Sequence, residues 1–472
     1  MKMVQHTSLN DILHPRSVAL VGISSRPEEF THMYLKGLID FPFKGPIYPV
    51  NPKVTQIRDL QAYPSVMDIP GPVDYVFSLL PARLTPPLVE ECVAKEVNVL
   101  AMFTSGFREK DEAGAAMEAE IVRIARKGGM RILGPNCLGL YCPAVGLGLR
   151  SDFPREVGNV AFISQSGGNA TDVIMMGKHL GIRFSKVISY GNASDLSESD
   201  FLEYLTEDPE TEIIAAYIEG VKDGARFFRA LTEAAAVKPV VVLKGGCSEG
   251  GNRAATAHTG VLAASEVVWD VALKQSGVIR VYSLEELVDV ILALKLVVHS
   301  GPNLAIFSIG GGSAVQAADE CERAGLVVPL LPTQIQQKLE EFTPDVGTSV
   351  RNPVDGAWLT PDGIEKAFKI LSECPDINII VPIIRVDMLL GISGVALAEG
   401  LSQAMIAASK LTSKPVVFVL RASNSIEAQQ AAIVMKDHCL EANIPVYTSV
   451  SSAARALSNV VRHHQRRAAV VM

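Results

Sequence analysis

Short apolar runs alternate with longer segments of mixed polarity along most of the chain. The first run, residues 17–23, reads Ser-Val-Ala-Leu-Val-Gly-Ile, and four further runs follow before residue 134. Continuous apolar runs rich in β-branched residues are typical of buried parallel strands. The segments between them, such as 86–96 and 112–127, have the length and polarity of surface helices. Strands that alternate with helices predict a parallel, doubly wound sheet.

The same alternation occurs three times, so the sequence predicts an α/β protein with three consecutive doubly wound parallel-sheet domains. The expected strands are 17–23, 46–51, 73–80, 97–103 and 130–133, then 159–164, 185–189, 212–218 and 239–243, and finally 304–309, 377–386, 415–420 and 445–449. Residues 143–158 are rich in Pro and Gly and predict a linker. We therefore expect domains at 1–143, 158–298 and 302–462, followed by a solvated tail at 463–472.

Composition narrows the possible partners. The 472 residues include 43 Lys and Arg against 51 Asp and Glu, a net charge of −8, which leaves no electrostatic footprint for nucleic acid. The seven cysteines have irregular spacing without a metal-ligand pattern, which predicts reduced thiols in a cytoplasmic protein. The start of the chain lacks the apolar run of a signal peptide, and we find no apolar window long enough to span a bilayer. We expect no membrane partner.

The turn after the first predicted strand argues against a nicotinamide site. A dinucleotide turn requires G-x-G-x-x-G and an acidic residue at the end of the second strand. Here only Gly22 is in place, and Lys53 stands where the acid should be. Ser24, Ser25 and Arg26 would instead meet a ligand rich in phosphate, such as coenzyme A, at the N-terminus of the following helix. A degenerate fold that binds nothing at this turn remains an equal alternative.

Two other strand-to-helix turns carry glycines where a helix begins. Ser166-Gly167-Gly168 leads into one predicted helix, and Gly311-Gly312-Ser313 leads into another. The first N–H groups of a helix have no intrahelical partner and attract an anion, and glycine lets that anion approach the backbone. Glycine is also common in any tight turn, so each turn alone is a weak signal for a phosphate site.

A lone histidine, His258, lies in a loop of Ala, Thr and Gly that follows the predicted strand 239–243 and four glycines. An imidazole on such a loop can accept a phosphoryl group and carry it between partners. Glu219 ends the strand 212–218, at a sheet edge where α/β sites form, and could orient one imidazole nitrogen. An ordinary surface histidine and a solvated acid are the alternative interpretation.

Taken together, these motifs resemble the α subunit of NDP-forming acyl-CoA synthetases, the ADP-forming acetate–CoA ligases of the succinyl-CoA synthetase superfamily. The resemblance rests on motifs in order along nearly the whole chain: residues 103–109 (Phe-Thr-Ser-Gly-Phe-Arg-Glu), 133–139 (Leu-Gly-Pro-Asn-Cys-Leu-Gly), 163–168, 189–192, 217–220, 257–260, 308–318 and 350–355. It implies a Rossmann-like CoA-binding domain followed by two flavodoxin-like ligase domains.

The resemblance also implies roles for single residues. His258 would be phosphorylated on a mobile loop, and Glu219 would stabilise and orient the phosphohistidine. The helices that begin at Ser166–Gly168 and Gly311–Ser313 would hold phosphate. Coenzyme A would lie near Gly22, Ser24, Ser25, Arg26, Lys53, Pro81, Ser105 and Asn136.

The implied reaction converts an acyl-CoA, phosphate and ADP into a small carboxylic acid, CoA and ATP, reversibly, through an acyl phosphate. We find no ATP-grasp-like region in the sequence, so ADP or ATP with Mg²⁺ is expected on a separate β subunit in an αβ or α2β2 complex.

Two features depart from the family pattern. The third domain has Ser-Ile-Gly-Gly-Gly-Ser at 308–313 where an Asn-Ala-Gly-Gly-Pro type of turn is usual, and Ala257 precedes His258 where Ser is common. They leave open a second hypothesis, a CoA-binding regulatory protein or pseudo-enzyme of the same fold without turnover. The retained His-Thr-Gly loop and Glu219 argue against it, because a protein that only binds CoA needs neither.

Overall fold

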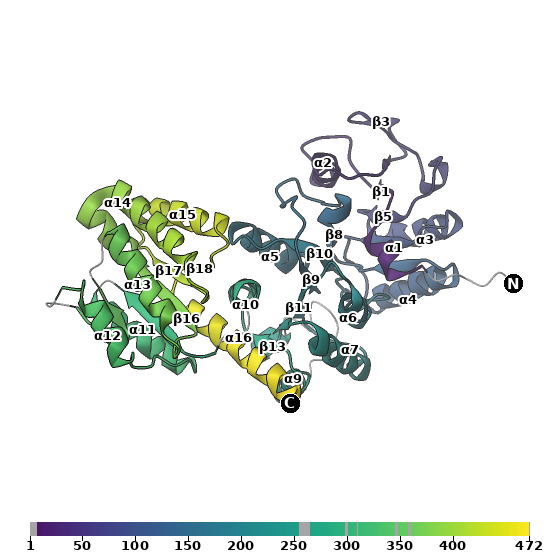
Figure 1. The fold of residues 1–472 in the computed structure, drawn as a ribbon. Helices are drawn as coiled ribbons and strands as arrows, with labels where there is room; N and C mark the ends of the chain where they lie inside the picture. Colours follow the sequence, from purple (N-terminus) through teal and green to yellow (C-terminus); the bar gives the residue numbers. More distant parts are fainter. Residues whose placement is uncertain are drawn as a thin grey trace. The chain divides into compact units, whose positions relative to one another are not determined.

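Three largely parallel sheets follow one another along the chain (Figure 1). The computed structural model describes residues 7–253, 265–297, 301–308, 310–344, 348–356 and 360–471. These residues belong to two compact units, 1–287 and 288–472; the first unit contains two of the sheets and the second contains the third. The predicted α/β class with doubly wound sheets is confirmed.

The first sheet has the strand order β2-β1-β5-β6-β7, and all of its neighbouring strands are parallel. Its strands are β1 (Val18–Val21), β2 (Ile47–Val50), β5 (Tyr75–Ser78), β6 (Val99–Met102) and β7 (Arg131–Leu133). A small antiparallel pair, β3 (Gln56–Ile57) and β4 (Leu60–Gln61), follows β2.

The second sheet has the order β13-β12-β11-β9-β10-β8, in which only β8 is antiparallel to its neighbour. Its strands are β8 (Gly139–Tyr141), β9 (Val160–Ser164), β10 (Phe184–Ser189), β11 (Ile213–Ile218), β12 (Val240–Lys244) and β13 (Ile279–Val281). The third sheet has the order β15-β14-β16-β17-β18 and is parallel throughout. Its strands are β14 (Leu304–Ser308), β15 (Val354–Asp355), β16 (Ile379–Arg385), β17 (Phe418–Arg421) and β18 (Val446–Tyr447).

Helices connect the parallel strands. In the first unit they are α1 (Leu9–Leu13), α2 (His32–Asp40), α3 (Thr85–Ala94), α4 (Glu112–Lys127), α5 (Gly167–His179), α6 (Glu198–Glu207), α7 (Gly224–Val237) and α9 (Glu266–Gln275), with short 3₁₀ turns at Val66–Asp68, Ala82–Leu84 and Pro143–Val145. Helix α10 (Leu284–Leu296) crosses the boundary between the units. The second unit adds α11 (Gly311–Arg323), α12 (Thr333–Glu340), α13 (Pro361–Glu373), α14 (Val386–Ser409), α15 (Ile426–Glu441) and α16 (Val450–Val471).

The three sheets share one topology. Numbered within each sheet, and leaving β8 aside, the strand order is 2-1-3-4-5 in every case. The order reverses beside the first strand, so a crevice forms at the carboxyl ends of the first and third strands, where doubly wound folds bind ligands. These positions are β1 and β5 in the first sheet, β9 and β11 in the second, and β14 and β16 in the third. The predicted site residues are concentrated in the turns that follow these strands.

The first two sheets share a hydrophobic core. One buried cluster includes Phe77 and Leu133 from the first sheet together with Ile163 and Ile188 from the second. Strand β8 helps to join them, because it directly follows β7 of the first sheet in sequence yet pairs with β10 of the second sheet. The two domains of the first unit are therefore packed as one body, which fixes the relative positions of their turns.

Three segments differ from the expectation. The predicted linker 143–158 is packed, with Leu147, Leu149 and Phe153 buried. The second unit starts within α10, before the predicted boundary at 298, and the Tyr447 hydroxyl donates to the Asp289 carbonyl at 3.0 Å. The predicted tail 463–472 is instead largely helical, because α16 continues to Val471 and its His463 side chain is 4% exposed.

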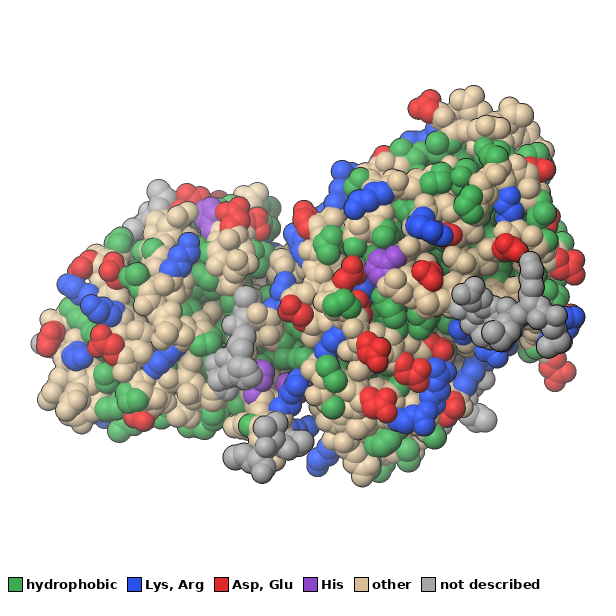
Figure 2. Space-filling view, turned by 45° about the vertical axis from the view of Figure 1, so that its right-hand side comes forward, with side chains coloured by type: hydrophobic (Ala, Val, Ile, Leu, Met, Phe, Trp, Pro, Cys, Tyr) green, Lys and Arg blue, Asp and Glu red, His purple; other side chains and the backbone are tan. Residues whose placement is uncertain are grey.

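The surface of each unit carries both signs of charge. Figure 2 shows Lys and Arg side chains interspersed with Asp and Glu side chains on the face drawn, as expected for a chain of net charge −8. Within the described ranges, none of the helices combines the length and the apolar character that a bilayer span requires.

Candidate functional site

In the second sheet, a side-chain amide joins the two turns that border the crevice at the carboxyl ends of β9 and β11. Gln165 directly follows β9, and its Oε1 accepts the N–H groups of Glu219 and of Gly220, the latter at 2.9 Å. Its Nε2 donates to the Gly220 carbonyl, also at 2.9 Å. The turn after β11 is therefore fixed to the turn after β9 by three hydrogen bonds, all buried.

Glu219 is predicted to orient an imidazole, and the structure gives it a fixed backbone. Its side chain and backbone together are 9% exposed. Besides the contact with Gln165, its carbonyl accepts from the buried Lys244 ammonium at 2.8 Å, and its carboxylate accepts from the Tyr217 hydroxyl at 3.2 Å. Burial lowers the pKa of Lys244, and the neighbouring Cys247 and Glu219 oppose that shift. A carboxylate so placed can hold a hydrogen-bond donor in a single orientation.

The N-terminus of α5 offers unpaired backbone donors. Ser166 is the N-cap, and its hydroxyl accepts from the Asn169 N–H at 3.2 Å. Helix geometry leaves the N–H groups of Gly167 and Gly168 without intrahelical acceptors. A Cβ on Gly167 would approach Leu138 to 3.3 Å, whereas one on Gly168 would contact only the Ser166 hydroxyl, at 3.7 Å. The space beside Gly168 is therefore open to an anion.

The first sheet ends in a turn that approaches a neighbouring strand closely. Gly22 has a φ of 85°, and a Cβ there would come within 3.0 Å of Leu80. Ser24 donates its N–H to the Thr31 hydroxyl at 3.1 Å, and its carbonyl lies 3.1 Å from His32 Nδ1. Arg58 donates to His32 Nε2 at 2.9 Å, so Nδ1 carries the proton and donates to Ser24. Only glycine suits the first position of this turn.

The other predicted CoA residues of the first sheet lie on the same carboxyl edge. The Lys53 N–H donates to Asn51 Oδ1 at 2.9 Å, and the Asn51 amide donates to the Ile23 carbonyl at 2.8 Å, which ties the two loops together. Lys53, Ser25 and Arg26 are exposed, and Arg26 forms an ion pair with Glu29. The exposed Pro81 precedes the 3₁₀ turn after β5. The loop edge thus carries cations that can meet phosphate groups.

Ser105 and Asn136 come from the loops after β6 and β7. Asn136 has a φ of 58°, and its N–H donates to the Thr104 carbonyl at 3.1 Å, so the two loops are joined. The Glu109 carboxylate accepts hydrogen bonds from the backbone N–H groups of Gly106 and Phe107. It also accepts one from the side-chain amide of Asn192, at 2.6 Å. Burial acts to raise the pKa of Glu109, but these hydrogen bonds outweigh it and lower the pKa.

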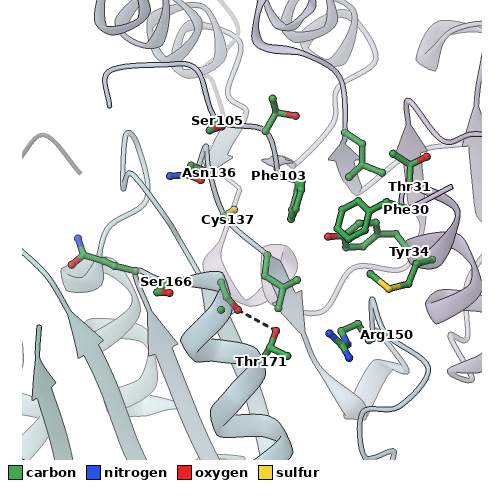
Figure 3. A pocket seen from close by; sticks show the side chains of 17 residues that line it. Phe30, Thr31, Tyr34, Phe103, Ser105, Asn136, Cys137, Arg150, Ser166 and Thr171 are labelled. Carbon is green, nitrogen blue, oxygen red and sulfur yellow. Dashed lines mark hydrogen bonds between the residues drawn. The ribbon is translucent and has the colours of Figure 1, made fainter. Parts of the chain in front are cut away.

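One cavity of about 620 Å³ unites residues from both sheets of the first unit. From the first domain it takes Ser105 and Asn136, and from the second it takes Gln165 and the segment 166–168. Figure 3 shows Ser105, Asn136 and Ser166 on one side of this cavity. Its other lining residues are Phe30, Thr31, Met33, Tyr34, Leu79, Phe103, Thr104, Cys137, Leu138, Arg150 and Thr171. The structure therefore brings two predicted CoA residues and a predicted phosphate turn to one space.

Cys137 lies against this cavity but is not a reactive thiol. Its side chain is buried, and it donates to the Met102 and Leu133 carbonyls at 3.5 and 3.6 Å. Burial raises the pKa of Cys137 to about 12. A thiol with so small a thiolate fraction at neutral pH is a poor nucleophile.

The predicted phosphate turn of the second unit has a different environment. Gly310, with a φ of 109°, donates its N–H to Asp355 at 2.8 Å, and a Cβ on Gly311 would come within 3.3 Å of the same carboxylate. A Cβ on Gly312 would meet nothing within 4 Å. Ser313 donates its N–H back to the Gly310 carbonyl at 3.1 Å. An acid takes up one donor of this turn, so its anion site is weaker than that of Ser166–Gly168.

His258 lies outside the described residues, so the structure does not place it. The sequence did not single out Gln165, although it is part of the quoted motif 163–168, because its role depends on a turn 54 residues further along the chain. The aromatic lining by Phe30, Tyr34 and Phe103 was also not anticipated. Within the described ranges, no group of His, Cys, Asp and Glu is arranged to hold a metal ion.

Comparisons with known proteins give the context for this site. Residues 16–143 match the family described as a CoA binding domain, and residues 157–294 match the succinyl-CoA ligase like flavodoxin domain. The alpha subunit of ADP-forming acetate–CoA ligase II from Pyrococcus furiosus is 35% identical over 454 residues, which are 95% of this chain and 97% of that one. ADP-forming acetate–CoA ligase I from Archaeoglobus fulgidus is 39% identical over 377 residues, which are 79% of this chain but 54% of that protein.

A solved structure agrees over the whole chain. The dinucleotide forming acetyl-coenzyme A synthetase 1 of Ca. Korarchaeum cryptofilum, in complex with phosphate and ADP, has a TM-score of 0.85 at 29% identity, with 100% of this chain and 99% of that one covered. Fold and site together define a CoA-binding ligase of the α/β class. More narrowly, the chain belongs to the ADP-forming acetate–CoA ligase family, and its extent corresponds to the alpha subunits of that family.

Proposed function

We propose that this chain provides the acyl-CoA and phosphohistidine chemistry of an ADP-forming acyl-CoA synthetase. The supporting observation is the cavity that contains Ser105 and Asn136, from the predicted CoA site, together with Gly167 and Gly168, from the predicted phosphate turn. Both reactants of the first step, a CoA thioester and an inorganic phosphate, would meet there. The reaction then depends mainly on positioning and on stabilisation of charge.

Three transfers account for the reaction. A phosphate oxygen attacks the thioester carbonyl, the carbon–sulfur bond breaks, and CoA leaves as a thiolate that takes a proton. An imidazole nitrogen of His258 then attacks the phosphorus of the acyl phosphate, which releases the carboxylic acid as its anion. Finally the terminal phosphate oxygen of ADP attacks the phosphohistidine to give ATP and the free imidazole.

The residues of the second domain serve the first two transfers. The backbone N–H groups of Gly167 and Gly168, at the positive end of α5, would bind the phosphate and its developing charge. Glu219 would accept a hydrogen bond from the N–H of the second nitrogen of His258, which keeps the attacking nitrogen unprotonated and stabilises the phosphohistidine. Gln165 and Lys244 fix the backbone of Glu219 for this role. Gly311, Gly312 and Ser313 would form a separate phosphate-binding turn of the second unit.

Coenzyme A would bind along the carboxyl edge of the first sheet. Gly22 permits close approach of a ligand to the backbone, and Ser24 and Ser25 provide hydroxyl donors. Arg26 and Lys53 carry exposed positive charge suited to its phosphates. Pro81, Ser105 and Asn136 lead from this edge towards the cavity, so the thiol end would reach the phosphate turn.

A partner chain would complete the enzyme. The Pyrococcus furiosus relative is itself named as an alpha subunit, which supports a separate β subunit in an αβ or α2β2 complex. We place ADP or ATP and Mg²⁺ on that ATP-grasp partner. The seven cysteines are all free, which agrees with a reducing cytoplasm.

A reconstituted assay tests this function. The chain is combined with a co-purified ATP-grasp β subunit, and CoA-dependent release of ADP from ATP is measured with a panel of carboxylic acids. Turnover that requires both chains and is abolished in His258→Asn supports the proposal. Calorimetric CoA binding without turnover, with each β partner offered, would support the regulatory or pseudo-enzyme alternative instead.

A further inference from the structure

The cavity of the first unit has a polar end and an apolar end. Its polar lining comes from Ser105, Asn136 and residues 165–168. Figure 3 shows Phe30, Tyr34 and Phe103 together on the opposite side from Ser105, Asn136 and Ser166. Met33 and Leu79 add apolar atoms to the lining. The proposed function uses the polar end for the thioester and phosphate, and so far it assigns no ligand to the apolar end.

Three aromatic rings form the apolar wall. The centroids of Phe30 and Tyr34 are 5.5 Å apart with an interplanar angle of 87°, and Phe103 lies 5.7 Å from Phe30 and 5.4 Å from Tyr34. The ring of Phe77 packs against Tyr34, with the two centroids 5.3 Å apart. The separations lie in the range at which aromatic rings attract one another, with Phe30 and Tyr34 edge to face and Phe103 tilted against both. The wall is thus a preformed surface for a further ring.

One ring of the wall is uncovered. Phe30 is 58% exposed although it precedes α2 and lines the cavity, whereas Tyr34 is 1% exposed. An exposed aromatic side chain in the lining of a concave site gains more buried apolar area from a ligand than one that is already buried. Phe30 is therefore the residue of the wall that gains most from an apolar ligand.

The charge nearest the wall is already compensated. Arg150 lines the cavity, but its guanidinium makes a bidentate contact with Asp152, at 3.0 Å from Nε and 2.7 Å from the terminal nitrogen. The guanidinium carbon of Arg150 also lies over the Phe153 ring, 5.5 Å from its centroid. The contact with Arg150 lowers the pKa of Asp152 and keeps it charged. A second carboxylate on the ligand would thus meet a neutralised pair, which disfavours a dicarboxylic acid.

The pantetheine arm of CoA fits the apolar end poorly. That arm contains two amides, and an amide buried without hydrogen bonds is costly. At this end the Thr31 hydroxyl, which already accepts from Ser24 at 3.1 Å, and the Tyr34 hydroxyl would have to serve both amides, because the rings of Phe30 and Phe103 offer neither donors nor acceptors. An apolar acyl group has no such requirement.

We propose that the aromatic wall of Phe30, Tyr34 and Phe103 binds the acyl group, and that the preferred substrate is a monocarboxylic acid with an aromatic ring rather than acetate or a dicarboxylic acid. This inference rests on the proposed function, because it takes the polar end of the same cavity to be the thioester and phosphate site. Phe30 then acts as a specificity-determining residue.

The test compares acids and variants in the reconstituted enzyme, with phenylacetate, acetate and succinate as probes. The wild type should show a kcat/KM for phenylacetate at least about tenfold above those for acetate and succinate, since a well-placed ring gains this much from aromatic contacts and burial. Phe30→Ala should lower the ratio of phenylacetate to acetate roughly fivefold to tenfold. Met67→Ala removes another exposed apolar side chain of the first unit, 46% exposed and outside the cavity lining, and should leave the ratio unchanged.

Two results would overturn the inference. One is an equal or greater kcat/KM for acetate or succinate. The other is a Phe30→Ala variant in which the KM of CoA rises equally with every acid, which would place CoA itself against the wall. Calorimetry on the chain alone separates this inference from the proposed function. If no acid is turned over, tighter binding of phenylacetyl-CoA than of acetyl-CoA, reduced in Phe30→Ala, still supports the aromatic site, and equal binding refutes it.

Discussion

Gln165 and Gly220 pair as two backbone strands would, although one partner is a side chain. The amide of Gln165 donates to the Gly220 carbonyl and accepts the Gly220 N–H, both at 2.9 Å. Because the two residues follow β9 and β11, the pair closes the crevice of the second sheet at its base. It also fixes the backbone of Glu219 against Gln165, the residue just before the N-cap of α5.

Replacing Gln165 by Leu should separate these two turns. The buried N–H groups of Glu219 and Gly220 would lose their acceptor, at a cost on the order of 2 to 4 kcal/mol of unfolding free energy. We expect kcat of the reconstituted enzyme to fall more than tenfold with little change in the KM for CoA. Gln165→Glu retains the acceptor for both N–H groups and should recover part of both losses. Denaturant unfolding and steady-state kinetics measure these effects. An unchanged kcat in Gln165→Leu would show that the hydrogen bonds of Gln165 to the turn after β11 do not serve catalysis.

Gly168→Ala tests the phosphate turn at little cost to the fold. A Cβ at this position meets only the Ser166 hydroxyl at 3.7 Å, and alanine favours a helix by up to about 1 kcal/mol over glycine. The methyl group would instead occupy the space of the bound anion, so the KM for phosphate should rise at least about tenfold.

The matched control is Gly224→Ala. Gly224 begins α7 as Gly167 begins α5, and a Cβ there meets nothing within 4 Å. Its stability should change like that of Gly168→Ala while its phosphate KM stays at the wild-type value. An equal rise in both variants would show that the effect is not specific to the turn.

Glu198 should make the stability of the first unit depend on pH. It is buried at the start of α6, and burial raises the pKa of Glu198 to about 7. Because the folded pKa lies above the unfolded value of about 4.5, its contribution to stability is complete below that value and is lost as the pH rises through 7. The loss is on the order of 3 kcal/mol, at 1.36 kcal/mol for each pKa unit.

Glu198→Gln keeps the shape of the side chain and removes the titration. Its unfolding free energy should fall less between pH 5 and pH 8 than that of the wild type, so that the variant is the more stable protein at pH 8. Glu207→Gln, at the exposed end of the same helix, should follow the wild type. Denaturant titrations at four pH values check this, and parallel curves for wild type and Glu198→Gln would contradict it.

Cysteine labelling tests the assignment of Cys137 as an inert thiol. Iodoacetamide at pH 8 should modify the half-exposed Cys247 of the folded protein and leave Cys137 unmodified, since burial raises the pKa of Cys137 to about 12. Peptide mass spectrometry reads both sites. After unfolding in guanidinium chloride Cys137 should react as well, which controls for detection. Rapid modification of Cys137 in the native state would show that the loop opens and that a thiol is available in the cavity.

The longer strands could be predicted from the sequence because buried parallel strands are apolar throughout. Each expected strand overlaps an observed one, from 17–23 with Val18–Val21 to 445–449 with Val446–Tyr447. The short strands β3, β4, β8, β13 and β15 were not expected, because each has only two or three residues, and the pairing of β8 with β10 is a contact between domains. The C-terminal tail was predicted wrongly for a related reason. The run of Arg and His at 462–467 is polar enough to predict a solvated tail, but in the structure it belongs to α16, which buries one face of it.

The site could be predicted only where local motifs define it. A strand end followed by small residues marks a helix N-terminus, so the segments 166–168 and 311–313 were found at the starts of α5 and α11. The hydrogen bonds of Gln165 to the turn after β11, and the wall of Phe30 and Phe103, depend on residues distant in sequence that only the packed sheets bring together. A pocket built from separate loops has no period or spacing in one sequence.

The most direct measurement is the site of phosphorylation. The chain is incubated with acyl-CoA and [32P]phosphate, or with [γ-32P]ATP and the β subunit, and the labelled peptide is identified by mass spectrometry under alkaline conditions. The account predicts an acid-labile label on His258 that is lost in His258→Asn and is transferred to added ADP. A label on another residue, or its absence while the wild-type enzyme turns over, would contradict the account.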